Sequence, residues 1–337
     1  MPHSDLTRPP PPRSLQVEVT GSCNLRCRMC LVRYRPALGR SASMPFQTFR
    51  RLLEELPEVR DVTLQGLGEP LLAPDLFRMV AYCRERGITV GFNTNATLLT
   101  PANGARLIEA GLDWLHVSVD GASPETYQFV RDGARWETVE RNVTGFVRLL
   151  RERRAVRPEV SLVMVLMRRN LRELPAVVER AARWGIPRVF VQGLSHDFSD
   201  APDEAYAAIA RYAAEQTVAG LPREEVETVL EQARDVAAWE GVHLRLPALA
   251  PRPARAEVDG TPVGCDWPWR AAYVGYDGTV QPCCMVMGSD RAAMGNVHAV
   301  SFREVWEGEA FRRFREGLVT GRPHPVCRGC AAYRGTF

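Results

Sequence analysis

From about residue 14 to residue 192, short strand-like stretches alternate with longer segments whose apolar residues have helical spacing. The short stretches are either apolar throughout or alternate between apolar and polar residues. The short stretches are SLQVEVT, DVTLQG, ITVGFNT, WLHVSVD, EVSLVMVLM and PRVFVQG. DEAYAAIARYAAEQ and REEVETVLEQARDVAAW complete the last helical layer. Regular strand–helix alternation is typical of parallel strands joined by right-handed crossovers. Six units predict an α/β fold, a partial (β/α)6 TIM-like barrel that is open rather than closed.

Side-chain parity within the predicted strands separates an apolar face from a polar one. In WLHVSVD the apolar face is formed by Leu115, Val117 and Val119. The polar faces of the first, second and fourth strands hold Gln16, Glu18, Thr20, Thr63, Gln65, His116, Ser118 and Asp120. Because the apolar face must pack against helices, the polar face should line the barrel lumen. The pattern therefore favours a polar binding cavity over a filled structural core.

The amino-acid composition of the chain changes at about residue 245. Residues 246–262, LPALAPRPARAEVDGTP, have the composition of a linker. AAYVGYDGTVQPCC predicts a β-hairpin with Asp277-Gly278 at its turn, and SFREVWEGEAFRRFREGL predicts an amphipathic helix. We expect a flexible proline-rich arm over 1–12, a barrel over 13–245 and a small C-terminal hairpin-plus-helix domain over 246–337.

Composition narrows the class of protein. Hydrophobic residues make up 45% of the 337 residues and the formal net charge is only +3, so we expect no nucleic-acid partner. The basic run RLLRERRAVRP can be a phosphate patch or the solvated end of a helix. No apolar run long enough for a membrane span or a signal peptide is present, which predicts a cytoplasmic protein with no membrane partner. All 43 basic residues are arginines, and the lack of lysine excludes a pyridoxal-phosphate Schiff base and a Walker A loop.

Two groups of cysteines indicate metal sites rather than a disulfide scaffold. Cys23, Cys27 and Cys30 occupy one loop after the first predicted strand. Three thiolates on one loop can hold three irons of a four-iron cube and leave the fourth iron free of protein ligands. A zinc ion normally closes with four ligands, and a distant cysteine could supply the fourth, so spacing alone leaves zinc open.

This C-x-x-x-C-x-x-C loop, at the end of the first strand of a partial barrel, resembles the radical S-adenosylmethionine superfamily. The resemblance implies a [4Fe–4S] cluster whose open iron binds the amino and carboxylate groups of S-adenosylmethionine. It also implies reductive cleavage of that cofactor to a 5′-deoxyadenosyl radical, which abstracts a hydrogen atom from the substrate.

Further stretches carry the same resemblance. GLGEPLLAPDL is similar to the family's GGEP motif, with Leu67 in place of the first glycine of the pair. FNTNATLL is similar to the third-strand region near the ribose, although Ala96 departs from the family's glycine. The cofactor-binding residues implied are Met29 (through its backbone, near adenine), Gly66, Gly68, Glu69, Asn93, Asn95 and Ser118.

The C-terminal cysteines resemble the auxiliary-cluster domains of SPASM and twitch radical enzymes. Cys265 is followed after twelve residues by Gly278 and after four more by Cys283, with Cys327-x-x-Cys330 further on. These four cysteines imply one fully ligated auxiliary [4Fe–4S] cluster, the shorter twitch-like arrangement. A zinc ribbon is the alternative, because two cysteine pairs would serve it equally well.

Three residues stand apart from these sets. Cys83, on a predicted helix, reads as a small buried hydrophobe. Cys284 follows a cluster ligand and either donates a hydrogen atom to the substrate or only lines the cavity wall. His116 is either a general base in the lumen or a satisfied interior histidine.

The resemblance favours an oxidoreductase that dehydrogenates a small-molecule, sugar-like alcohol, with the auxiliary cluster as electron acceptor. An external reductant such as flavodoxin or ferredoxin would supply the starting electron. Epimerisation with Cys284 as hydrogen donor, peptide maturation and a non-enzymatic zinc protein are the alternatives, and no leader-binding domain is seen before the barrel. Arginines at the mouth could hold an anionic substrate, namely Arg33, Arg35, Arg168 or Arg169.

Overall fold

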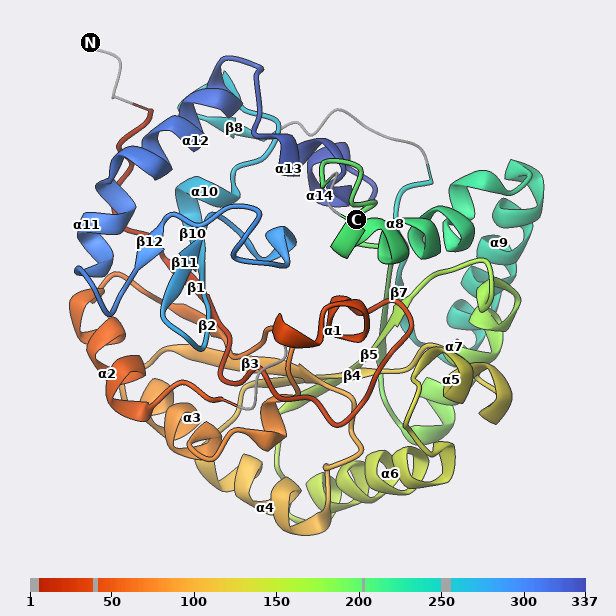
Figure 1. Ribbon diagram of the computed structural model, residues 1–337. Coiled ribbons are helices and arrows are strands. Elements are labelled where there is room, and N and C mark those ends of the chain that lie inside the picture. Colours follow the sequence, from red (N-terminus) through yellow and green to blue (C-terminus); the bar gives the residue numbers. More distant parts are fainter. Residues whose placement is uncertain (1–5, 39–41, 202–203, 250–255) are drawn as a thin grey trace.

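One curved sheet of ten strands organises the computed structural model, which describes residues 6–38, 42–201, 204–249 and 256–337 (Figure 1). The strand order is β12-β11-β10-β1-β2-β3-β4-β5-β6-β7. The parallel barrel strands are β1 (Ser14–Val17), β2 (Asp61–Thr63), β3 (Thr89–Thr94), β4 (Trp114–Ser118), β5 (Glu159–Val165), β6 (Arg188–Gln192) and β7 (His243–Arg245). The six predicted strands and the α/β partial barrel are confirmed. The three-residue β7 was not predicted, because it is too short to show a period.

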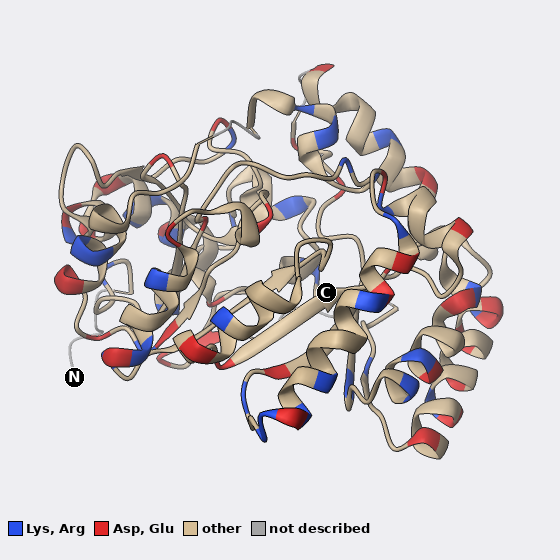
Figure 2. Cartoon of the chain, turned by 90° about the horizontal axis from the view of Figure 1, so that it is seen from below, with Lys and Arg blue, Asp and Glu red and all other residues tan. Residues whose placement is uncertain are grey.

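A layer of helices covers the outer face of the sheet (Figure 1). Its members are α2 (Phe46–Glu55), α3 (Leu76–Glu85), α4 (Pro101–Ala110), α6 (Trp136–Glu152), α7 (Leu174–Trp184) and α9 (Arg223–Glu240). Figure 2 shows acidic and basic residues interspersed on the outer helices. No helix among the described residues is both long and apolar enough to cross a bilayer.

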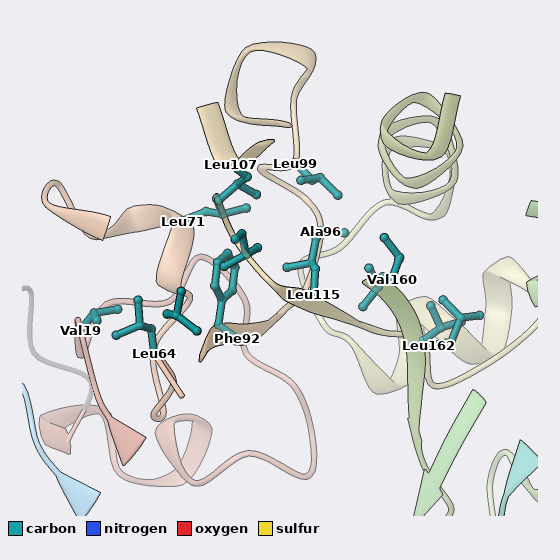
Figure 3. Close-up of a cluster of buried hydrophobic side chains, with 14 of the residues drawn as sticks. Val19, Leu64, Leu71, Phe92, Ala96, Leu99, Leu107, Leu115, Val160 and Leu162 are labelled. Carbon is teal, nitrogen blue, oxygen red and sulfur yellow. The ribbon is translucent and has the colours of Figure 1, made fainter. Parts of the chain in front are cut away.

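The main core lies between the sheet and this outer layer. Leu115, Val117 and Val119 are fully buried, as strand parity predicts. They join apolar side chains from the neighbouring strands and loops, including Leu64 and Phe92 (Figure 3). Burying each such side chain contributes roughly 1.5–3 kcal/mol, so the aliphatic faces of the strands hold the barrel against its helices.

The C-terminal segment extends the barrel sheet instead of standing apart from it. Strand β10 (Ala271–Val274) pairs in parallel with β1, and β11 (Thr279–Gln281) and β12 (Gly295–Asn296) add antiparallel neighbours. The predicted hairpin turn is confirmed, with Gly278 at a φ of 81°. Phe302, Trp306 and Phe311 belong to the main core. The boundary expected near residue 245 therefore separates two stretches of sequence that share a sheet and a core.

Two local expectations need correction. The predicted amphipathic helix is two helices, α11 (Phe302–Glu307) and α12 (Glu309–Val319), because Gly308 has extended backbone between them. Part of the expected linker forms a small hairpin of β8 (Glu257–Val258) and β9 (Thr261–Pro262), while residues 250–255 lie outside the described residues.

Residues 6–12, expected to be part of a flexible arm, are held against the C-terminal segment. The Trp269 indole donates to the Leu6 carbonyl at 2.6 Å, and the Trp306 indole donates to the Pro10 carbonyl at 3.0 Å. Buried indole N–H groups need acceptors, and a proline-rich strand offers carbonyls. Residues 1–5 of the predicted arm lie outside the described residues.

Arg315 on α12 is the fully buried centre of this contact. Its guanidinium donates to the carbonyls of Pro268 at 2.9 Å, Trp306 at 2.9 Å and Thr7 at 3.1 Å, and its Cζ lies 4.1 Å from the Trp306 ring centroid. Burial lowers the pKa of Arg315 to about 9. One side chain thus joins the N-terminal segment to two parts of the C-terminal segment.

We expect Arg315→Ala to lower the free energy of unfolding by about 3 kcal/mol, because three buried carbonyls lose their donor and a packed side chain is removed. The matched control is Arg313→Ala on the same helix, where the side chain is 76% exposed and pairs only with Glu309. Its effect should stay within about 0.5 kcal/mol. Urea unfolding measures both, and equal effects would contradict the role given to Arg315.

Candidate iron–sulfur sites and lumen cavity

The loop that carries Cys23, Cys27 and Cys30 leaves the carboxyl end of β1 and ends in the short helix α1 (Leu31–Tyr34). Two backbone hydrogen bonds fix it to the segment after α5 (Pro124–Val130). The Arg26 N–H donates to the Asp132 carbonyl and the Arg28 N–H donates to the Val130 carbonyl, both at 2.9 Å. The sequence places the thiols on one loop, and these contacts hold the loop at the carboxyl edge of the sheet.

The surroundings of the three thiols suit an anionic metal cluster. Arg131 donates to the Cys27 sulfur at 3.8 Å and is itself paired with the fully buried Asp120 at 2.5 Å. The Leu25 N–H donates to the Cys23 sulfur at 3.5 Å. Burial raises the pKa of all three thiols, that of Cys30 to about 12, so iron must replace their protons on binding. The Arg131–Asp120 pair was not predicted as part of the site.

The GLGEP loop packs backbone to backbone against the start of the cysteine loop. A Cβ at Gly68 would lie 2.1 Å from the Thr20 carbonyl oxygen and 2.7 Å from that of Ser22. The Glu69 N–H donates to the same Ser22 carbonyl at 2.8 Å. Only glycine fits at residue 68, because the contact is with main chain that cannot give way.

Glu69 is buried and tied to the end of β3. One carboxylate oxygen accepts from the Thr94 hydroxyl at 2.7 Å and from the Leu71 N–H at 3.3 Å, and the other accepts from the Asn95 N–H at 2.8 Å. A carboxylate has capacity for about one donor more, such as the amino group of S-adenosylmethionine. The loop, the cysteines and the third strand thus form one connected unit.

The remaining cofactor-binding candidates lie around this unit. Asn95 donates to the Asn24 side chain at 3.0 Å and so reaches the cysteine loop. Ala96, at the family's glycine position, has a φ of 57°, in the left-handed region that glycine prefers. Ser118 is buried at the end of β4, and Met29 is half-buried against the main core. Their contacts with S-adenosylmethionine stay predictions.

The structure brings the four C-terminal cysteines together from three segments. Cys265, Cys283, Cys327 and Cys330 line one cavity of about 20 Å³ that is otherwise walled by apolar groups such as Phe314. Burial raises the pKa of all four thiols, and neighbouring thiols raise the pKa of Cys265, Cys283 and Cys327 further. Among the described residues, no three His, Cys, Asp or Glu side chains close around a single metal ion. In a cubane cluster each thiolate binds a different iron, so four cysteines are the donor set that a fully ligated [4Fe–4S] cluster requires.

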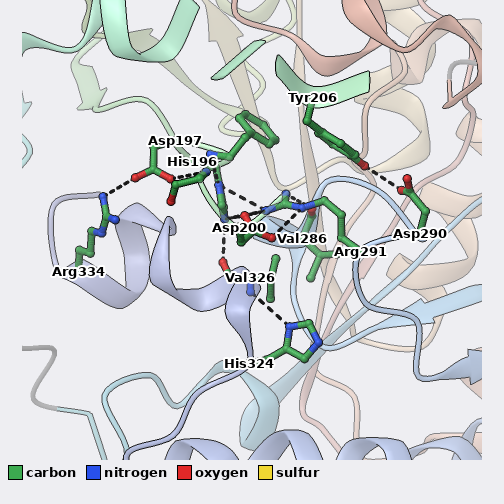
Figure 4. A network of polar contacts seen from close by, with 12 residues as sticks. His196, Asp197, Asp200, Tyr206, Val286, Asp290, Arg291, His324, Val326 and Arg334 are labelled. Atoms are coloured by element: carbon green, nitrogen blue, oxygen red, sulfur yellow. Dashed lines mark hydrogen bonds and ion pairs between the residues drawn. The ribbon is translucent and has the colours of Figure 1, made fainter. Parts of the chain in front are cut away.

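A buried polar network braces this auxiliary site (Figure 4). His196, in the loop after β6, contacts the Val326 carbonyl at 2.7 Å and forms a backbone bridge with Cys330. Arg291 pairs with Asp200 at 2.5 Å and donates to the Val286 carbonyl at 2.6 Å. The network therefore joins a barrel loop to the segments before and after the cluster ligands, which sequence spacing could not indicate.

A cavity of about 760 Å³ is here named the lumen cavity. Its lining includes Gly66 and Leu67 of the loop that packs against the cysteine loop, and Cys284 and Met285, which follow the auxiliary-site residue Cys283. The polar side chains that line it include Gln16, Glu18, Gln65, Asn93, Gln192, Tyr273 and Gln281. The expected polar lumen is therefore confirmed for three of the parity residues, Gln16, Glu18 and Gln65.

Other residues of the predicted polar strand faces contact the protein itself and do not line the lumen cavity. Thr20 donates to the Ala42 carbonyl at 3.0 Å, and Asp120 pairs with Arg131. His116 lies between aromatic rings, with centroid distances of 4.5 Å to Trp114 and 5.3 Å to Phe190. Burial, with a smaller effect of Arg245, lowers the pKa of His116 to about 4. His116 is not among the described residues that line the lumen cavity, and its role as a general base stays a prediction.

The remaining candidates also have clear places. Cys83 is fully buried in the main core on α3, as expected for a hydrophobe. Arg33 pairs with Asp132, Arg35 with Asp290 and Arg169 with Glu125. None of the four arginines considered for an anionic substrate, Arg168 included, is among the described residues that line the lumen cavity.

Glu18 is a buried carboxylate in the lining of the lumen cavity. Only 6% of the residue is exposed, and a Cβ at Gly66 would lie 2.2 Å from its Cγ, so residue 66 must be glycine. The Leu67 N–H donates to Oε1 at 2.7 Å. Burial raises the pKa of Glu18 to about 7, against hydrogen bonds from Leu67, Tyr276 and Tyr273, and nearby Asp277 raises it further.

Because the pKa of Glu18 is raised on folding, its contribution to stability is full below about pH 4.5 and is lost as the pH rises through 7. Glu18→Gln removes this dependence and keeps an acceptor for Leu67. The free energy of unfolding of the variant, relative to that of wild type, should increase by about 3 kcal/mol between pH 5 and pH 8. Urea unfolding over this pH range measures the effect, with Glu137→Gln at an exposed residue of α6 as the control. If the free energies of unfolding of wild type and Glu18→Gln depend on pH in the same way, the prediction is wrong.

Comparisons with known proteins agree with this architecture. The Radical SAM superfamily model matches residues 17–181, and an iron-sulfur cluster-binding domain model, SPASM, matches residues 265–331. The crystal structure of Streptococcus suis SuiB bound to precursor peptide SuiA superposes with a TM-score of 0.69 at 16% identity, covering 96% of this chain and 70% of that one.

Curated relatives are similar over nearly the whole chain. The tungsten-containing aldehyde ferredoxin oxidoreductase cofactor-modifying protein of Pyrococcus furiosus is 23% identical over 94% of this chain and 86% of its own. The AdoMet-dependent heme synthase of Methanosarcina barkeri is 26% identical, covering 95% and 91%. The PqqA peptide cyclase of Xanthomonas campestris is 28% identical, covering 95% and 80%. The chain therefore belongs to the radical S-adenosylmethionine superfamily, as an enzyme that binds S-adenosylmethionine and a [4Fe–4S] cluster and carries a C-terminal SPASM iron–sulfur domain.

Proposed function

We propose that this enzyme dehydrogenates a small molecule at an alcohol carbon of a sugar-like substrate. When bound, S-adenosylmethionine and its cluster supply a 5′-deoxyadenosyl radical that removes a hydrogen atom, and the auxiliary cluster supplies an acceptor for the remaining electron. The hydroxyl proton leaves as the carbonyl forms. An external reductant such as flavodoxin or ferredoxin delivers the starting electron in the cytoplasm, a location in keeping with nine free cysteines.

One observation carries this proposal, namely that residues next to each of the two cysteine sites line the lumen cavity. Its lining includes Gly66 and Leu67 from the loop that packs against the start of the cysteine loop. The lining also includes Cys284, next to the auxiliary ligand Cys283. A substrate in this cavity lies within reach of a hydrogen-atom acceptor and of an electron acceptor. Its volume of about 760 Å³ suits a small molecule.

Incubation of the reconstituted enzyme with S-adenosylmethionine, dithionite and pools of sugars and aminopolyols tests this function. Mass spectrometry should find a product lighter than its substrate by two hydrogen atoms, formed in step with 5′-deoxyadenosine. A product of unchanged mass would argue for epimerisation instead.

Cys284 separates these two reactions, since its thiol lines the lumen cavity and burial raises its pKa to about 12. A neutral thiol is the form that can donate a hydrogen atom. For a dehydrogenase, Cys284→Ala should leave product formation within about threefold of wild type, because the electron goes to the cluster. An epimerase that uses Cys284 would lose its product and still form 5′-deoxyadenosine.

Peptide modification is the second candidate function. It is favoured by similarity to the PqqA peptide cyclase of Xanthomonas campestris, 28% identical over 95% of this chain. A peptide whose mass changes on incubation with enzyme and S-adenosylmethionine, where no sugar or aminopolyol reacts, would select it.

Iron content tests the assignment of the two cysteine sets. Wild-type protein reconstituted without oxygen should bind about eight irons, and Cys23→Ala/Cys27→Ala/Cys30→Ala should retain about four and form no 5′-deoxyadenosine. Cys265→Ala/Cys283→Ala should also retain about four irons but still cleave S-adenosylmethionine under dithionite. Cys83→Ala is the control and should bind as much iron as wild type. Stoichiometric zinc in a colourless protein would contradict both assignments.

A further inference from the structure

Most of the polar side chains that line the lumen cavity are uncharged hydrogen-bonding groups. Five amide side chains line it, and each offers both donors and an acceptor. They come from β1, the loop after β2, β3, the end of β6 and β11, and are Gln16, Gln65, Asn93, Gln192 and Gln281. Such a lining suits a molecule rich in hydroxyl or amide groups.

The charge of the lining has one sign. Glu18 and Asp277 are the charged side chains among the described residues that line the cavity, and both are carboxylates. Arginine supplies all 43 basic residues of the chain, yet no described lining residue is an arginine. A phosphate or carboxylate on the ligand would meet these carboxylates with no described cation to balance it.

Glu18 accepts hydrogen bonds from Leu67, Tyr276 and Tyr273 but pairs with no cation among the described residues, and its second oxygen faces the C-terminal hairpin. Oε1 accepts the Leu67 N–H at 2.7 Å. Oε2 lies near Gly275, where a Cβ would be 3.8 Å from it and 2.9 Å from Asp277 Oδ1. The two carboxylates thus approach one point on the cavity wall. Asp277 also accepts the Thr279 N–H at 3.0 Å, which fixes its orientation.

A buried carboxylate without a cationic partner is costly, and that cost is recovered when a ligand brings a positive charge. Burial already raises the pKa of Glu18 to about 7, because the surrounding residues stabilise its charged form poorly. An ammonium group donates up to three hydrogen bonds and so can contact Oε2 of Glu18 and neighbouring acceptors together.

We infer that the substrate carries a protonated amine, and that this ammonium group binds at Glu18 in the lumen cavity. The inference rests on the proposed function, which puts the substrate in that cavity. The amino group of S-adenosylmethionine is expected at Glu69 of the GLGEP loop, which is not among the described residues that line the cavity, although the cofactor-binding candidates Gly66 and Asn93 are.

Three probes with one carbon skeleton test this inference: glucamine, sorbitol and gluconate. They differ at a single carbon, which bears an ammonium, a hydroxyl or a carboxylate group. Calorimetric titration of the reconstituted enzyme, saturated with S-adenosylmethionine, should show glucamine binding about tenfold more tightly than sorbitol, and gluconate most weakly. Glu18→Gln, which keeps the side-chain shape, should bring glucamine to the affinity of sorbitol.

Glu137→Gln, on the exposed face of α6, is the matched control and should keep the full preference for glucamine. Three outcomes would overturn the inference: equal or undetectable binding of all probes, preference for gluconate, or an unchanged preference in Glu18→Gln. Loss of S-adenosylmethionine binding in Glu18→Gln would also overturn it, because Glu18 would then serve the cofactor.

A parallel assay keeps this result separate from the proposed function. Formation of 5′-deoxyadenosine under dithionite is measured in the same wild-type preparation. If it is absent, the proposed radical chemistry fails whatever the probes show. If it is present and the probes show no ammonium preference, only the inference about the amine fails.

Discussion

The parallel pairing of β10 with β1 is the constraint on which the functional architecture depends. It joins Ser14–Val17, which leads into the radical-site cysteines, to Ala271–Val274, which leads through the hairpin to Cys283 and Cys284. Because paired strands lie about 5 Å apart, the segments that follow these two strands are brought together. Residues of both strands, Gln16 and Tyr273, therefore line the same lumen cavity.

Glycine and carboxylate residues set the radical site within this frame. Gly68 allows two loop backbones to touch, and Glu69 then ties the loop to the end of β3. Arg131 beside Cys27 adds a positive charge whose own burial is balanced by Asp120. The GLGEP motif therefore has a structural role as well as a cofactor-binding one: it fixes the loop that presents the three thiols.

Buried hydrogen-bond donors join the C-terminal segment to residues 6–10 and to the barrel loop after β6. Arg315 and two tryptophans use the carbonyls of residues 6–10, and His196 and Arg291 tie a barrel loop to the auxiliary cysteines. These contacts explain why a stretch with the composition of a free arm is ordered. Proline-rich composition describes what a segment cannot form, but not which buried donors will use its carbonyls.

The sequence by itself determined six of the seven parallel barrel strands, the hairpin turn and the polar lumen, because periodicity and parity are local properties of the chain, and it indicated the two cysteine sets through their spacing and family resemblance. Tertiary structure alone decided which polar residues reach the cavity. Glu18 lines it, whereas His116 and Asp120, on the same predicted face of β4 and its extension, are taken up by aromatic rings and by Arg131. It also decided that β10 joins β1, since strand partners distant in sequence depend on packing that no local pattern records.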